Sequence, residues 1–273
     1  MFVCRGSPES VRGFTLPKQR ERTRAPRPAV ALREGGFTLI ELLVVVGIIA
    51  LLLVLIAPAF TYIRGGTDVT SAAYTIQGVL DTARTYAKAN NTYTWVGFFE
   101  EDVPPPSENP APPGTGRVVI SIVASKDGTI IYNSGIPGTI DTTRLIQVGK
   151  LVEVDNVHLA DLTDGSGGGS TFDTRPPVTF NGTPYRIGTA TPPNTGTLFQ
   201  YPAASPYAFA KAVQFSPRGE ARIINSATSY SLQTAAEVGL EPTHGATVPG
   251  SVPANVVAIQ FTGFGGNVKI YRK

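Results

Sequence analysis

The side chain with the clearest chemical requirement is the carboxylate of Glu41. It is the only charged group in the apolar stretch 37–60, and a carboxylate at the centre of a bilayer costs about 2.5–3.5 kcal/mol on insertion scales. No Lys, Arg or His follows Arg33 in its neighbourhood. Cleavage between Gly36 and Phe37 would place a new α-amine one helical turn from Glu41. The sequence therefore predicts that processing creates the positive partner that this carboxylate lacks.

The stretch around Glu41 has the length and composition of a membrane-spanning helix. As an α-helix, residues 37–60 would be about 36 Å long, enough for a hydrocarbon core of roughly 30 Å. Residues 42–57 show no polar face, whereas a buried core helix of a soluble domain normally has one. A secretory signal peptide is the alternative. The apolar run is longer than the usual signal-peptide core, however, and no small-residue cleavage site directly follows it.

The charge distribution predicts the orientation of this helix. Residues 1–36 hold eight Lys/Arg and three Asp/Glu, which gives a net charge of +5. Residues 37–273 hold fifteen Lys/Arg and seventeen Asp/Glu, which gives a net charge of −2. The positive-inside rule places the basic segment in the cytoplasm and the body beyond residue 60 on the far side of the membrane. The net charge of −2 argues against general nucleic-acid binding by the body.

The segment "GGFTLIELLVVVGIIALLLVLIAPAF" closely resembles the class III signal of type IV prepilins and type II secretion pseudopilins. The resemblance implies that a prepilin peptidase/methyltransferase cuts after Gly36 and N-methylates Phe37. It implies that Glu41 registers subunits during assembly and that Pro58 loosens the helix. Partners implied in the same way are other pilins or pseudopilins, contacted through the N-terminal helix, and an inner-membrane assembly platform.

The remaining chain is predicted to complete an α+β, pilin-like fold. We expect a leader at 1–36, a transmembrane or filament-core helix at 37–60, its amphipathic continuation at 61–91 and a β-rich periplasmic domain at 92–273. Apolar residues at three- and four-residue steps from Val69 to Ala87 indicate one buried helical stripe. The body reads as a mainly antiparallel sheet, with a predicted hairpin between 117–124 and 129–134. Flexible loops are expected at 100–116 and 163–176, because Pro, Gly and Ser are concentrated there.

Two hairpin motifs extend the resemblance to the GspH/FimT-like group of minor pseudopilins. "VQFSPRGEARI" carries Phe215, Pro217 and Gly219 in the Phe-x-Pro-x-Gly pattern of that group. "VVAIQFTGFGGNVKIYRK" (256–273) is similar to its closing hairpin. Basic residues cluster on both motifs and are candidate DNA contacts: Arg218, Arg222, Lys269, Arg272 and Lys273.

No motif for catalysis is present in the sequence. Ser-His-Asp order, a zinc-protease helix, a phosphate-binding loop and a dinucleotide fingerprint are all missing. The chain has one cysteine, Cys4, and two histidines, His158 and His244, which we expect to be solvated surface residues. Asp161, Asp164 and Asp173 surround a glycine-rich loop and form a candidate calcium site, since Ca²⁺ prefers several oxygen ligands on a bendable backbone. No other cofactor and no enzymatic activity are expected.

The function expected from these features is structural. The chain is predicted to be a minor pilin or pseudopilin, held in the bacterial inner membrane by a single pass and assembled into a periplasmic pseudopilus or a type IV pilus. A DNA-binding FimT-like minor pilin for DNA uptake is one alternative. A single-pass anchored periplasmic binding domain is the other, and it predicts no processing at Gly36.

Overall fold

The computed structural model describes residues 38–104, 107–131, 139–190, 196–202, 205–223, 232–248, 250 and 255–273, with side chains for all of these except 54–68. The chain divides into two compact units, residues 1–50 and 51–273, and helix α1 (Leu39–Ala89) contributes to both. Among the residues with described side chains, no helical stretch is both long enough and apolar enough to cross a membrane.

Twelve strands and one short 3₁₀ helix follow α1 in the described part of the chain. Their bounds are β1 (Thr94–Asp102), β2 (Gly116–Ser125), η1 (Thr142–Arg144), β3 (Leu145–Gln147), β4 (Val152–Leu159), β5 (Thr179–Phe180), β6 (Thr183–Pro184), β7 (Arg186–Ile187), β8 (Lys211–Phe215), β9 (Ala221–Ile223), β10 (Ala236–Pro242), β11 (Val257–Phe261) and β12 (Val268–Arg272). This arrangement confirms the predicted α+β class with a mainly antiparallel sheet.

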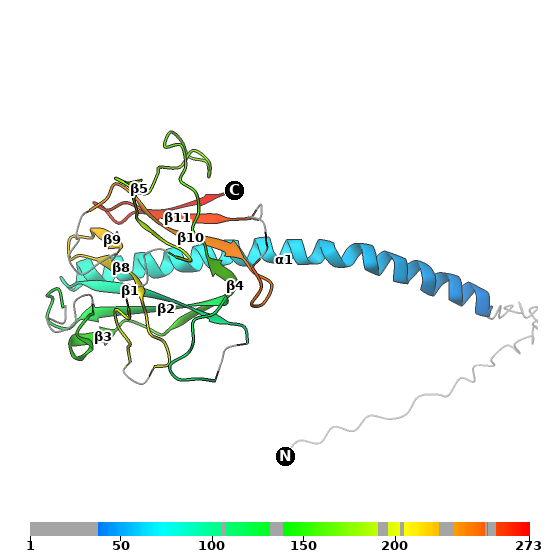
Figure 1. Ribbon diagram of the computed structural model, residues 1–273, viewed down its shortest axis with the longest axis horizontal. Coiled ribbons are helices and arrows are strands. Elements are labelled where there is room, and N and C mark those ends of the chain that lie inside the picture. The colour runs from blue at the N-terminus through cyan, green and yellow to red at the C-terminus, as the bar shows by residue number, and fades with distance from the viewer. Residues whose placement is uncertain are drawn as a thin grey trace, which may run out of the picture. The chain divides into compact units, whose positions relative to one another are not determined.

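Most of the strands form one sheet in the order β12-β11-β10-β4-β2-β1-β8-β9 (Figure 1). Strand β3 pairs with the end of β2, and β7 pairs with β10 in the only parallel pairing found in the described sheets. Strands β5 and β6 make a separate hairpin. Strands distant in sequence are therefore neighbours, and β10 lies between β4 and β11.

The second half of α1 supplies one side of the main hydrophobic core. Its buried stripe matches the predicted positions, with Val69, Ala73, Ile76, Leu80 and Ala83 each 0% exposed. These side chains pack against apolar residues of β1, β2, β4 and β7–β11. The helix ends at Ala89, close to the expected bound of residue 91. Asn91 has a left-handed φ of 48°, a conformation common just beyond helix ends.

Strand β1 is buried on both faces of the sheet. Val96 and Phe98 face the core formed with α1. Trp95 and Phe99 face a second core, which segments between 111 and 145 and between 198 and 212 complete. A strand covered on both sides reads as a continuous apolar run, and this explains why the period-2 alternation is weak in the β1 sequence.

A bulge in β4 determines which side chains enter the core. Gly116 pairs with Val157 and Arg117 pairs with Asp155, so Asn156 is the extra residue, and its φ is 62°. An inserted residue reverses the alternation of side chains along a strand. Before the bulge, Val154 packs against the core formed with α1. After the bulge, Val157 and Leu159 belong to the same core. By the same alternation, His158 lies on the opposite face.

Several local predictions differ from the structure. The predicted hairpin between 117–124 and 129–134 is not formed, because residues 129–131 are not in a strand. The end of β2 pairs with β3 instead. The predicted loop 100–116 is shorter than expected, since β1 continues to Asp102 and β2 begins at Gly116. Strand β1 extends because Glu100 and Glu101 have partners on other strands, His158 and Arg117.

The predicted flexible loop 163–176 is fastened to the core. Arg175 is 1% exposed and forms an ion pair with Glu237 of β10, at 3.0 Å between Nε and Oε2. Its guanidinium also donates to the carbonyl of Phe172 at 2.8 Å and lies over the ring of the same residue. The polar composition indicated a solvated linker. The buried ion pair between Arg175 and Glu237 instead holds this loop in place.

Candidate functional site

Helix α1 begins with a reciprocal hydrogen-bond arrangement between Thr38 and Glu41. The backbone N–H and the hydroxyl of Thr38 donate to Oε2 of Glu41 at 2.9 and 2.8 Å. The N–H of Glu41 lies 3.3 Å from the Thr38 hydroxyl, which accepts it. This is a capping box, which satisfies N–H groups that have no partner in the first helical turn. The Thr-x-x-Glu spacing in the sequence is the local signal for this arrangement.

The capping box leaves one oxygen of Glu41 available. Both bonds from Thr38 end on Oε2, and no described residue donates to Oε1. Around it, the side chains of residues 39–53 are exposed and almost entirely apolar. The site therefore presents a positioned carboxylate oxygen within an apolar helix surface. Gly36 and Phe37 lie outside the described residues, and Pro58 lies within the α1 backbone where side chains are not described.

The Phe-x-Pro-x-Gly residues form the turn between β8 and β9. The N–H of Gly219 donates to the carbonyl of Ser216 at 2.8 Å, so Pro217 is the second residue of the turn and Gly219 the fourth. Pro and Gly are favoured at these two positions. Gly219 has a φ of 85°, and Phe215, 0% exposed, packs in the core with α1. The local structure thus explains why each residue of the motif has the type that it has.

The turns of the two predicted hairpins meet at the end of α1. The N–H of Ala221 donates to the carbonyl of Gly263 at 2.8 Å. A Cβ on Gly266 would lie 2.6 Å from the Gly219 carbonyl oxygen and 3.1 Å from Cδ of Arg84. A Cβ on Gly219 would lie 3.0 Å from Cδ of Lys88. Glycine at both turns therefore allows the β8–β9 and β11–β12 hairpins to seat closely on α1.

The candidate DNA-contact residues are spread over both hairpins. Arg218 is exposed in the β8–β9 turn, and Arg222 is half-buried in β9. Lys269 lies 4.6 Å from the ring centroid of Tyr271, and Arg272 lies 5.3 Å from that of Tyr74 on α1. Lys273 is exposed. Two of these five cations are thus engaged with aromatic rings of the same chain.

Two of the three aspartates of the candidate calcium site, Asp161 and Asp164, have separate partners. Asp161 accepts the N–H of Ala190 at 2.7 Å, and Asp173 is exposed. Asp164 accepts the N–H groups of Val178 and Thr179 at 3.2 and 3.1 Å and pairs with Arg186. Among the residues described, no group of three or more His, Cys, Asp or Glu side chains could hold a metal ion. The structure thus gives the calcium prediction no support.

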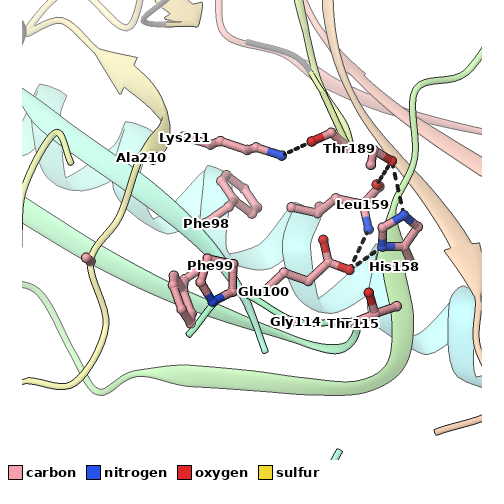
Figure 2. A pocket seen from close by; sticks show the side chains of 12 residues that line it. Phe98, Phe99, Glu100, Gly114, Thr115, His158, Leu159, Thr189, Ala210 and Lys211 are labelled. Atoms are coloured by element: carbon pink, nitrogen blue, oxygen red, sulfur yellow. Dashed lines mark hydrogen bonds and ion pairs between the residues drawn. The ribbon is translucent and has the colours of Figure 1, made fainter. Parts of the chain in front are cut away.

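A polar cluster that the sequence did not reveal surrounds His158. The prediction that His158 is a solvated surface residue was wrong, since it lies in β4 and is only 8% exposed. Its Nδ1 hydrogen-bonds with Oε1 of Glu100, which also accepts the N–H of Leu159 at 3.3 Å. Its Nε2 lies 3.0 Å from the hydroxyl of Thr189 (Figure 2) and 3.9 Å from Oε1 of Glu241.

The hydrogen bonds of this cluster fit a positively charged imidazole. The Thr189 hydroxyl donates to the carbonyl of Leu159 at 2.9 Å, so it is free to accept from Nε2. The imidazolium can then donate to Glu100 from one nitrogen and to Thr189 from the other. Burial opposes the charged form of His158, but the hydrogen bond and charge of Glu100 and the charge of Glu241 outweigh burial and raise its pKa.

Comparison with known proteins gives one result, at the start of the chain. Residues 32–57 match the family model of the prokaryotic N-terminal methylation motif. This motif is the class III prepilin signal of the type IV pilin and pseudopilin family, and the chain carries it. This motif supports a type IV pilin-like protein. No curated protein and no solved structure matches it.

Proposed function

We propose that this chain is a structural, non-enzymatic subunit, a minor pilin or pseudopilin, of a type II secretion pseudopilus or a type IV pilus. The observation that carries the proposal is the methylation motif at residues 32–57, with Glu41 at the first turn of α1. In this proposal the chain is anchored in the bacterial inner membrane by residues 37–60. The β-rich domain is periplasmic, and cleavage follows Gly36.

The assembly step follows from the surface of the helix. The apolar side chains of residues 39–53 are exposed. In a bilayer they would face lipid, and in a filament they would face the same segment of neighbouring subunits. Both surroundings are apolar, so the transfer costs little hydrophobic free energy. An axial register then has to come from a polar contact, because apolar contacts are not directional.

Glu41 is suited to provide that register. Thr38 holds its carboxylate through Oε2, and the methylated amine of Phe37 on a neighbouring subunit would bind Oε1. In an apolar surrounding, an unpaired carboxylate is strongly disfavoured, so only a processed subunit in the correct stagger would be tolerated. An unprocessed subunit lacks the amine and would be rejected.

The experiment that tests this proposal combines a processing assay with an assembly assay. The full chain is expressed with a prepilin peptidase and the other subunits of the filament system, and sheared filaments are collected. Gly36→Ile should block cleavage. Glu41→Gln should be cleaved normally but be absent from filaments. Glu108→Gln, which changes an exposed loop carboxylate, is the matched control and should assemble as wild type. Normal incorporation of Glu41→Gln would contradict the proposed role of this carboxylate.

A further inference from the structure

A cavity lies where the sheet divides next to the His158 cluster. Strand β4 pairs with β2 through residues 152–157 and then with β10 through residues 157–159. The end of β1 and the start of β8 face this point. The cavity has a volume of about 210 Å³ and is lined by Phe98, Phe99, Glu100, His158, Thr189 and Lys211, among others. Figure 2 shows these side chains converging from separate strands.

Lys211 supplies a positive charge on one side of the cavity. Its ammonium group donates to the carbonyls of Gly188 and Thr189, the latter at 2.9 Å. An ammonium carries three N–H groups, so one of them remains for a ligand. Burial lowers the pKa of Lys211, and the negative charges of Glu100 and Asp161 partly offset this effect. None of the described ion pairs includes Lys211, although the negative charge of Glu100 acts on it.

Glu100 supplies a negative charge on the other side. The bonds from His158 and from the N–H of Leu159 both end on its Oε1. In Figure 2 the second oxygen of Glu100 points toward the space between Phe98 and Leu159, with no bond drawn to it. The cavity therefore offers a carboxylate acceptor and an ammonium donor that face the same space without forming an ion pair.

Most of the remaining lining is apolar and limits what can enter. Phe98 and Phe99 lie beside the two charged groups, and Pro113, Leu159, Ala208 and Ala210 add apolar wall, whereas Thr115 adds a hydroxyl. A volume of about 210 Å³ is below the roughly 300–1,000 Å³ of sites for drug-sized ligands. The occupant should therefore be small, with a compact apolar part.

We propose that this cavity binds a small zwitterion of the α-amino-acid class. The ligand's ammonium binds Glu100, its carboxylate binds Lys211, and its side chain contacts the apolar part of the lining. Charge interactions are stronger in such a half-buried site than in bulk water, so a ligand with both charges is favoured over one with a single charge. This site is separate from the N-terminal assembly site, and its test does not depend on filament formation.

The test is a calorimetric titration of the full chain in detergent micelles with L-alanine and L-valine. Propionate and propylamine, which each carry one of the two charges, are the matched probes. The expected result is that the amino acids bind at least tenfold more tightly than either single-charge probe. Equal binding of all four compounds, or no binding of the amino acids, would overturn the proposal.

Two variants identify the cavity as the place of binding. Lys211→Met keeps most of the length of the side chain but removes its charge, and it should remove the preference for the amino acids. Lys269→Met, at an exposed position of β12, is the control and should bind like wild type. Circular dichroism reports whether each variant is folded. An unchanged preference in folded Lys211→Met would place binding elsewhere and would contradict the assignment.

Discussion

Replacing His158 with leucine tests the charged cluster at the end of β4. Leucine fills much of the same volume but cannot donate to Glu100 or Thr189. The carboxylates of Glu100 and Glu241 would then remain half-buried without the cation between them. We therefore expect the variant to be less stable than wild type near pH 6, where the imidazole carries its charge.

The expected loss can be worked out from the burial of the pair. The side chains of His158 and Glu100 are 10% and 11% exposed. Removing one partner of a buried pair costs about 3–5 kcal/mol, and the lower end, about 3 kcal/mol, suits a pair with some solvent access. For a unit of 150–250 residues, 1 kcal/mol corresponds to about 2–4 °C in Tm. Thermal unfolding of the full chain in detergent should thus show a Tm about 6–12 °C lower.

The pH dependence separates a charge effect from a packing effect. The pKa of His158 is raised in the folded protein, so its stabilisation is fully present below the unfolded value of about 6.5. It is lost as the pH rises through the folded pKa. The deficit of His158→Leu should therefore shrink between about pH 6 and about pH 9. His244→Leu, at an exposed histidine, is the matched control and should change little. A deficit of the same size at both pH values would refute the charge argument.

Three further substitutions have expected effects on thermal stability. Gly219→Ala should destabilise by about 1–3 kcal/mol, because φ is 85° and the new Cβ would lie 3.0 Å from Lys88; unchanged stability would refute the tight seating of this turn. Gly78→Ala should stabilise by about 0.5–1 kcal/mol, since Gly78 is in α1 with no atom within 4 Å of the added Cβ. Arg175→Met should cost about 3–5 kcal/mol because Glu237, 0% exposed, loses its partner; an effect under about 1 kcal/mol would show that the ion pair does not fasten loop 163–176.

The sequence was informative where the signal is local. The stripe of α1, the apolar strand β2, and the hairpins β8–β9 and β11–β12 were all predicted. Periodicity, β-branched residues and turn residues are properties of neighbouring positions. Pro217 and Gly219 define a turn within four residues, so their spacing was enough.

The elements that the sequence analysis missed depend on partners that are distant in the chain. Strand β10, "AEVGLEP", was not predicted, since it contains two glutamates, a glycine and a proline. It is nevertheless central, and Glu237 within it is buried because Arg175 reaches it from 62 residues away. In the same way, Glu100 is 58 residues from His158. Neither pair could be recognised from composition or periodicity.

The most direct test of the central claim is the intact mass of the protein isolated from its native membranes, with fragmentation of its N-terminus. Our account predicts a chain that begins at Phe37 and carries one added methyl group on its α-amine. A chain that keeps residues 1–36, or one cut after the apolar stretch 37–60, would contradict it.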